Sequence, residues 1–195
     1  MTSTISTTNQ TNNDRAARHR AGDERVTAGR VAEAVDGAAV ISVLFSGAIF
    51  GFFYAWVCST MWGLDATDPR VAIDAMQAMN ASVGNAVFFP AFFGTPFVLG
   101  AVAYALGRTG RRSAARLFAA AAVIYLVGGA LLTAAINVPM NEELAAVTIP
   151  TDIEAAQVIW DDYSGRWQFW NQTRTVFSGI SLALAAVGLT RINRP

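Results

Sequence analysis

The segment GAAVISVLFSGAIFGFFYAWVCSTMWGL, residues 37–64, contains no charged side chain. A bilayer core about 30 Å thick requires roughly 20 apolar helical residues to cross it, so this segment is long enough to span a membrane. The rest of the chain has a similar character, because 53% of its residues are hydrophobic and 14% are charged. A soluble domain has about 25% charged residues. The sequence therefore predicts an integral membrane protein.

Charge-free stretches predict three further membrane spans, although the last one begins before Arg174 because the apolar run after that residue is short. The four predicted spans lie near 38–61, 86–107, 114–136 and 171–190. Four spans with short connections favour an all-α fold, an up-down-up-down bundle of four helices. We also expect short helices in the two outer loops.

The positive charges predict the orientation of these spans. All 14 are Arg, and most lie before the first span, between the second and third spans, or after the fourth: Arg15, Arg18, Arg20, Arg25, Arg30, Arg108, Arg111, Arg112, Arg116, Arg191 and Arg194. The positive-inside rule makes these segments, and both termini, cytoplasmic in a multi-pass plasma-membrane protein. Only Arg70, Arg166 and Arg174 lie in the outer loops. This separation of charge gives no sign of nucleic-acid binding.

The domain organisation follows from a change in composition near residue 36. Residues 1–36 are rich in Thr, Asn and Arg and have few large apolar side chains. Such a segment cannot bury enough apolar surface to fold alone, so it is predicted to be a disordered cytoplasmic tail. Residues 37–195 form the predicted four-span transmembrane domain.

The first outer loop is expected to contain a helix that begins with Asp68 as the N-cap and Pro69 at the first helical position. Within this helix, Met76, Gln77 and Asn80 fall on one face. A face that mixes apolar and amide side chains is unusual for a solvated loop, and it indicates a binding surface. The alternative is that Gln77 and Asn80 hydrogen-bond to nearby backbone.

The second outer loop begins with Asn137 and Asn141 on either side of Pro139. Proline is expected to interrupt the third span here, and the two amides could then donate to the freed carbonyl groups. The alternative is that they line a polar site. A second helix is expected to start at Thr151 or Asp152 and to run toward the fourth span.

The stretch that enters the fourth span places Trp167, Trp170, Asn171 and Arg174 at helical spacing on one face. An interfacial belt of aromatic residues with an extended Arg would explain the tryptophans. It would not require Arg174 on the same face, about one turn inside the predicted boundary. Charged groups at such a depth usually point into a bundle or a wet cavity. We therefore predict a polar pocket at this face.

The sequence excludes several kinds of chemistry. Its sole histidine, His19, lies in the predicted tail, so a His-ligated haem, a carboxylate–His di-iron centre and a His-based triad are excluded. The adjacent pairs Glu142-Glu143 and Asp161-Asp162 are poor candidates for a metal site because neighbouring side chains on a helix point in different directions. We expect no metal and no cofactor, which leaves cofactor-free chemistry or simple binding.

Several short motifs occur in a characteristic order between the four spans. They are Ala75-Met76-Gln77-Ala78-Met79-Asn80, Asn85, Phe88, Pro139-x-Asn141-x-x-Leu144 and Trp167-x-x-Trp170-Asn171-x-x-Arg174-Thr175. A chain with these motifs resembles the anthrone oxygenase-like family, also called domain of unknown function 1772, over roughly residues 40 to 190. One departure is Gln172, where the resemblance leads us to expect His in many members.

The resemblance implies that an anthrone, a tricyclic phenolic ketone, is oxidised to an anthraquinone by dioxygen without metal or flavin. Arg174, Asn171 and Asn141 would then be the catalytic residues, with Arg174 and Asn171 stabilising an enolate oxygen. The implied substrate-binding residues are those that stack on or surround the ring: Trp167, Trp170, Gln77, Asn80, Met76 and Asn137. The general base stays open among the acidic residues of the outer loops: Glu142, Glu143, Asp161 and Asp162.

A non-enzymatic role is the competing hypothesis: a lipid- or quinone-binding protein, or a small subunit of a larger membrane complex. The expected partners are membrane lipids and an apolar aromatic small molecule, and the choice between a homo-oligomer and a larger complex stays open. Geometry distinguishes the hypotheses. Gln77, Asn141 and Trp170 converging on one closed pocket would favour binding or catalysis, whereas an outward-facing flat apolar surface would favour a protein partner.

Overall fold

A computed structural model describes the backbone of residues 3–192 and the side chains of residues 18–192. The described residues form helices and no strands. Four helical stretches are long and apolar enough to cross a membrane, so the predicted all-α membrane bundle is confirmed and the chain is a multi-pass membrane protein. Residues 1–2 of the predicted tail, the side chain of Arg15, and Arg194 lie outside the described residues.

Successive helices group into four segments of the described chain, each of which we call a leg. In chain order they are α1 (Ser3–Ala55), η1 (Trp56–Thr60) and α2 (Met61–Asp65); α3 (Pro69–Ser82) and α4 (Phe88–Arg108); α5 (Arg112–Tyr125), η2 (Leu126–Leu131), η3 (Thr133–Asn137) and α6 (Val138–Ala145); and α7 (Ile153–Thr190). The segments η1, η2 and η3 are π-helical.

The chain divides into two compact units, Met1–Gly37 and Ala38–Pro195. In the first unit the backbone is helical from Ser3, and the disorder of residues 1–36 stays a prediction from composition. The side chains of residues 18–31 are exposed, so local propensity accounts for this helix. The segment contains no Pro, and residues 14–25 are rich in Ala, Arg and acidic residues, several of which favour helix.

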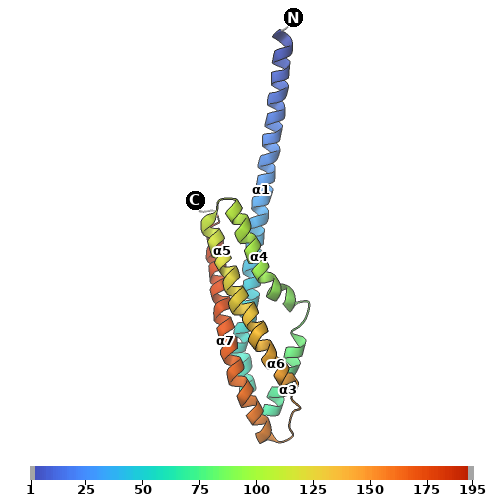
Figure 1. Cartoon of the computed structure of the whole chain (residues 1–195), viewed down its shortest axis with the longest axis vertical. Helices are drawn as coiled ribbons and strands as arrows, with labels where there is room; N and C mark the ends of the chain where they lie inside the picture. Colours follow the sequence, from blue (N-terminus) through green and yellow to red (C-terminus); the bar gives the residue numbers. More distant parts are fainter. Residues whose placement is uncertain (1–2, 193–195) are drawn as a thin grey trace. The chain divides into compact units, whose positions relative to one another are not determined.

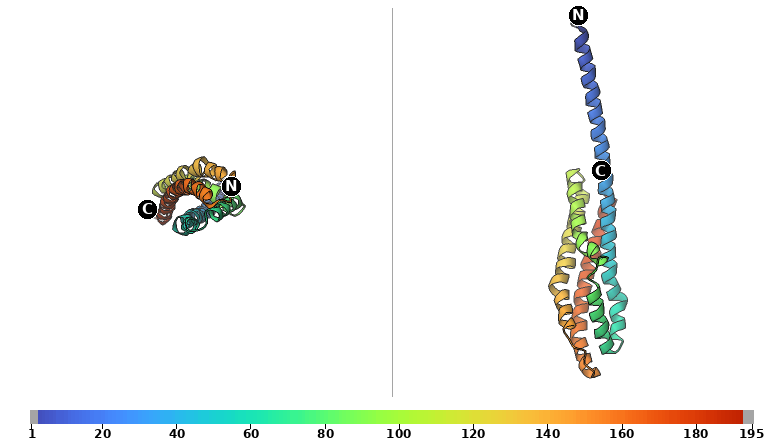
Figure 2. Two further views of the ribbon diagram at one scale, coloured as in Figure 1. Left: turned by 90° about the horizontal axis from the view of Figure 1, so that it is seen from below. Right: turned by 90° about the vertical axis from the view of Figure 1, so that its right-hand side faces the viewer.

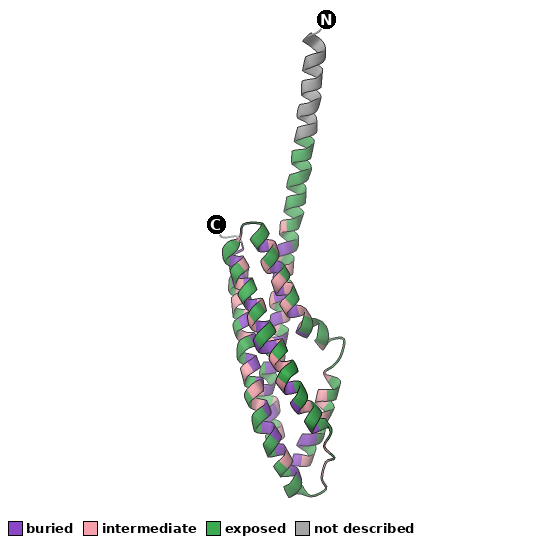
Figure 3. Ribbon diagram, viewed as in Figure 1, coloured by how far each residue is buried: buried purple, intermediate pink, exposed green. Residues whose placement is uncertain are grey.

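In the second unit, α5 packs between α4 and α7 (Figures 1 and 2). Two hydrogen bonds join these helices: the Tyr125 hydroxyl donates to the Phe92 carbonyl at 2.9 Å, and the Ser181 hydroxyl donates to the Ala121 carbonyl at 2.9 Å. Buried and exposed residues alternate along each helix of the bundle, as expected of helices with one face toward the interior (Figure 3). Because the outer faces are apolar, this pattern is typical of helices surrounded by lipid.

Helix lengths locate the membrane boundary along the bundle. The 21 residues of α4 span roughly 31 Å, the thickness of one bilayer core. The 38 residues of α7 span roughly 57 Å, so α7 extends well past the membrane. It does so at the end of the bundle where α3 packs against α6 and α7. We therefore expect the connection 83–87, between α3 and α4, at the membrane boundary on the α3 side.

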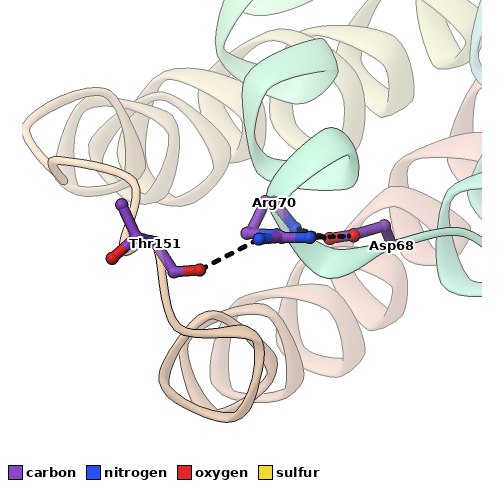
Figure 4. A network of polar contacts seen from close by, with 3 residues as sticks. All are labelled: Asp68, Arg70 and Thr151. Carbon is purple, nitrogen blue, oxygen red and sulfur yellow. Dashed lines mark hydrogen bonds and ion pairs between the residues drawn. The ribbon is translucent and has the colours of Figure 1, made fainter.

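The start of α3 is as predicted. The Asp68 side chain caps the helix by accepting a 2.9 Å hydrogen bond from the Arg70 backbone amide, and Pro69 follows it. The Arg70 guanidinium also bonds both carboxylate oxygens, at 3.0 and 2.6 Å, and donates to the Thr151 carbonyl at 2.9 Å (Figure 4). Arg70 therefore joins the start of α3 to the loop that precedes α7.

The interaction between Asp68 and Arg70 should make the stability of this junction weakly sensitive to acid. The hydrogen bond from the Arg70 side chain lowers the pKa of Asp68 to about 2 from its ordinary value of 3.8. Because the folded-state pKa is the lower one, the stabilisation is complete above pH 3.8 and is lost as the pH falls toward 2.

We expect Asp68→Asn to lower the melting temperature at pH 6, and this difference to shrink between pH 4 and pH 2. Thermal unfolding across that range, with Asp74→Asn on an exposed face of α3 as the control, measures it; a gap independent of pH would contradict it.

The third leg differs from the sequence-based expectation, and the fourth begins as expected. Pro139 does not interrupt its helix, because helix continues to Ala145. The π-helical segment η3 ends just before this proline, and such a local change in winding accommodates the missing amide donor. On the fourth leg, the Asp152 side chain caps α7 through the Ala155 amide, and the helix then runs without a break into the span.

Candidate functional site

The second unit encloses a small cavity of about 150 Å³, which we call the inner cavity. Its polar lining comes from α3, η3, α6 and α7, and consists of Asn80, Thr133, Asn141, Trp167 and Arg174. Its opposite wall is largely aromatic and comes from α1, η1 and α4: Phe52, Phe53, Trp56, Phe88, Phe89, Phe92 and Phe93. A cavity of this kind, mostly apolar with a few convergent polar groups, is typical of a small-molecule site.

The helical period of α7 brings its polar residues to this cavity. Trp167, Asn171 and Arg174 are buried on the inner face of α7, as the sequence pattern predicts. Trp170 lies at the edge of this face, where it is half-buried, packs against the neighbouring apolar core and contacts the Phe169 ring. It does not line the cavity.

Arg174 is held firmly at the cavity wall. Its Nε donates to the Asn171 side-chain oxygen at 3.0 Å, and its Nη1 donates to the Thr133 hydroxyl at 3.2 Å. The guanidinium carbon lies 4.3 Å from the centre of the Phe53 ring and 5.2 Å from the centre of the Trp167 ring. Contacts of a cation with aromatic faces are favourable, most strongly where water is excluded.

The Arg174 guanidinium has no carboxylate partner among the residues whose side chains are described. It is only 5% exposed, and the hydrogen bonds above use two of its five N–H donors. A buried charge normally requires an opposite charge and a full set of hydrogen bonds. Arg174 is therefore suited to receive an anionic or strongly polarised oxygen in the cavity.

Asn141 is a second fixed polar group of the inner cavity. Its side-chain oxygen accepts two hydrogen bonds of 2.9 Å, one from the Tyr163 hydroxyl and one from the indole nitrogen of Trp167. These bonds orient the Trp167 ring, whose centre lies 5.1 Å from that of Trp56. The two rings are tilted by 59° and form an aromatic wall beside Arg174.

Asn80 and Asn137 contain buried polar atoms without a hydrogen-bond partner among the described residues. In Asn80 this atom is the side-chain nitrogen, which lies near the Tyr163 hydroxyl; the residue lines the inner cavity, so this nitrogen can donate to a ligand. In Asn137 both polar side-chain atoms are unpartnered and the residue is fully buried. Asn137 does not line the inner cavity.

Two other predicted site residues, Gln77 and Met76, contribute to packing between helices and do not line the inner cavity. The Gln77 amide donates to the Leu144 and Val147 carbonyls, at 2.8 and 3.1 Å, and so joins α3 to the end of α6. Gln77 therefore hydrogen-bonds to backbone, which is the alternative considered above, although this backbone belongs to the end of α6 and not to its own helix. Met76 is buried in the apolar core between these helices. Gln77, Asn141 and Trp170 thus do not all converge on one pocket, because only Asn141 lines the inner cavity.

The acidic residues considered as a general base lie away from the inner cavity. All four are exposed: Glu142, Glu143, Asp161 and Asp162. Asp161 accepts a 2.8 Å hydrogen bond from Gln157, and Asp162 lies 3.6 Å from Arg166. Gln172 is also exposed on α7, so a side chain at this position points away from the cavity.

A second carboxylate, Asp65, has a structural role at the end of α2. It accepts hydrogen bonds from the Trp160 indole, the Ser164 hydroxyl and the Gln168 amide, at 2.9, 2.7 and 2.9 Å. These donors lie on α7, so the hydrogen bonds of Asp65 join the end of α2 to α7. Among the described residues, no group of three or more His, Cys, Asp or Glu side chains is placed to hold a metal ion.

Beside the inner cavity lies a larger groove of about 750 Å³ that opens to the surface, which we call the outer groove. Its walls come from α1, η1, the end of α3, the connection 83–87 and the start of α4. Most of its lining residues are apolar or aromatic, among them Ala48, Phe52 and Val87.

Sequence reasoning missed several residues of the inner cavity. Phe53 and Trp56 lie on the first leg, where apolar residues facing lipid look the same in the sequence. Thr133 carried a signal that could have been used, because it is an isolated hydroxyl in an otherwise apolar stretch of the third span. Tyr163 does not line the cavity but holds Asn141 in place, and it lies four residues before Trp167, on the face already identified.

Comparison with known proteins identifies a family for the chain. No curated protein and no solved structure matches the chain significantly. The profile of the family described as anthrone oxygenase matches residues 80–184, more than half of the chain. This region begins with Asn80 and includes Asn141, Trp167 and Arg174, so it contains all the polar groups of the inner cavity. The chain belongs to the anthrone oxygenase family.

Proposed function

We propose that the inner cavity binds the oxygen-bearing ring of a phenolic aromatic substrate of the anthrone type and promotes the oxidation of this substrate by dioxygen. The observation that supports this most directly is Arg174, a buried cation at the cavity wall with no carboxylate partner among the described side chains. A site with this charge favours the ionised form of a ligand that can lose a proton.

Ionisation is the step that the residues can promote. An anthrone and its phenolic tautomer lose a proton to give the same electron-rich oxyanion. In the proposed complex this oxygen accepts hydrogen bonds from Arg174 and from the unpartnered side-chain nitrogen of Asn80. In an apolar cavity such interactions are much stronger than in water. No described acidic residue lines the cavity, so in this proposal the proton leaves to water at the cavity mouth.

The oxidation then balances with dioxygen as the only other reactant. The methylene carbon of the anthrone loses both hydrogens and gains a double bond to one oxygen atom. The other oxygen atom leaves as water with the two hydrogens, so the substrate supplies all four electrons that reduce dioxygen. The rings of Trp167 and Phe53 keep the substrate flat and oriented while this happens.

The distribution of Arg supports a location for the reaction. Both termini and the connection between α4 and α5 are rich in Arg, so we propose that they face the cytoplasm. The end of the bundle that carries α3 then lies on the outer side of the membrane. We propose that this is the plasma membrane and that its lipids surround the four legs.

Oxygen uptake by the purified protein in lipid nanodiscs, with an anthrone and a metal chelator present, tests the proposal. We expect uptake above the spontaneous rate, one dioxygen consumed per anthraquinone formed, and one atom of labelled dioxygen in the product. A rate equal to that of empty nanodiscs would overturn the proposal. If the anthrone then still quenched tryptophan fluorescence, the site would be one for binding alone.

A further inference from the structure

The inner cavity is small for a whole polycyclic ligand. Its volume of about 150 Å³ matches that of an engineered apolar cavity that binds benzene. One aromatic ring and its oxygen therefore fill the space beside Arg174 and Asn80. Any further part of the ligand has to lie elsewhere.

The outer groove is the natural extension of this space. The two share the lining residues Phe52, Trp56, Met79, Val83 and Phe88. These aromatic and apolar side chains stand between the two adjacent spaces, so a ligand that occupies both passes among them. With about 750 Å³, the groove has room for a substituent larger than the ring.

The chemistry of the groove indicates what that substituent is. Ser82 and Asn85 are its lining residues with hydroxyl or amide side chains. Ser82 donates to the Met79 carbonyl at 2.9 Å, and the Asn85 amide donates to the Ser82 carbonyl at 2.8 Å. The Asn85 oxygen accepts from the Val87 and Phe88 amides. Because local backbone already uses these polar groups, the groove offers a ligand mainly hydrocarbon contacts.

The groove also lies at the right depth to exchange molecules with lipid. Its rim includes the connection 83–87, which we expect at the membrane boundary because α4 alone is about as long as a bilayer core is thick. Val87 on this rim is 88% exposed. An apolar side chain at this position contacts acyl chains or headgroups when the protein is in a membrane.

We infer that the natural ligand is an amphiphilic phenol. Its oxygen-bearing ring occupies the inner cavity beside Arg174, and the apolar remainder of the molecule lies in the outer groove and enters from the adjacent leaflet. This inference rests on the proposed function for the identity of the ring, and it adds the class of substrate and the route by which it arrives.

Photolabelling of the full-length protein in nanodiscs tests the inference. The probe is 4-octylphenol with a photoreactive diazirine at the end of its chain, and labelled peptides are identified by mass spectrometry. We expect label concentrated between residues 82 and 91 and around Ala48. Excess 4-octylphenol should prevent it at a concentration at least tenfold lower than phenol. Label spread evenly over the lipid-facing residues of all four legs would overturn the inference.

Two matched variants separate groove binding from contact with lipid. Ala48→Phe fills the groove from α1 and should reduce labelling of residues 82–91 at least tenfold. Ala101→Phe makes the same change at an exposed position of α4 that lines neither space, and labelling should equal that of the wild type. Equal labelling of both variants would contradict an occupied groove.

Failure of this inference can be distinguished from failure of the proposed function. Labelling confined to the groove, in a protein that does not oxidise anthrone, would support the amphiphilic ligand and remove the oxygenase. Oxidation of anthrone by a protein whose groove is not labelled would support the oxygenase and overturn the inference.

Discussion

Arg174→Met should lower the rate of anthrone oxidation by a factor of about 10² to 10³, the usual effect of removing one group that stabilises an oxyanion. The cause is the loss of the positive charge and of the donors that face the inner cavity. Arg174→Lys keeps the charge but not the geometry of the fork, so it should fall between the wild type and Arg174→Met. Oxygen uptake at saturating anthrone measures all three proteins.

Stability separates this effect from misfolding. Replacing a buried charge without a carboxylate partner by an apolar side chain of similar size is often neutral or stabilising. The melting temperature of Arg174→Met should therefore equal or exceed that of the wild type. Arg166→Met removes an exposed Arg of the same helix and should leave the rate unchanged. A folded Arg174→Met protein that oxidises anthrone at the wild-type rate would refute the proposed role.

Gly128→Ala should destabilise the bundle by about 1 to 3 kcal/mol, the usual cost of forcing an extra group into a packed interface. A Cβ atom at this position would lie 2.1 Å from Cγ and 2.5 Å from Cβ of Phe177 on α7. These atoms are close to the backbone of α7, so Phe177 cannot avoid the clash by turning its ring alone. Unfolding in mixed micelles, followed by circular dichroism, measures the loss.

Two further proteins make this prediction specific. Gly100 on α4 has no neighbouring atom within 4 Å of the position that its Cβ would occupy, so Gly100→Ala should be neutral or slightly stabilising. Adding Phe177→Ala to Gly128→Ala should recover stability relative to the sum of the two single changes. Strict additivity of the two changes would show that the close approach of η2 to α7 is not the cause.

The fold was predictable because lipid imposes a simple rule on the sequence. Charge-free stretches predicted the four spans, and Asp68 before Pro69 predicted the start of α3, since capping depends on neighbouring residues alone. The lengths of the helices were less accessible. The charge pattern places the membrane part of α7 near 171–190, but the helix is continuous from Ile153 and shows no structural break at that boundary.

The site was predictable only where one helix determines it. The spacing of Trp167, Asn171 and Arg174 placed them correctly on the inner face of α7. Gln77 and Asn80 are both amides on the same face of α3, yet one bonds to α6 backbone and the other lines the cavity. That difference depends on which helices pack against each turn of α3, and it cannot be derived from the spacing.

The aromatic wall was the least accessible part. Phe53 on α1 is fully buried against Arg174, whereas Phe97 on α4 is 74% exposed. Both are phenylalanines within apolar spans, and lipid solvates such side chains as well as a protein core does. Hydrophobicity alone therefore does not distinguish them.

The π-helical segments η2 and η3 affect how related sequences should be aligned. Each π turn holds about one residue more than an α turn, so a family member that lacks one residue between 126 and 137 can keep an unbroken third leg. In such a chain the residues after the deletion rotate by about 100° around the helix axis unless a π segment reverts to α. Single-residue gaps between homologues are therefore expected inside this span, where alignment methods usually penalise them. Placing such a gap in the following loop would pair Asn141 with the wrong residue.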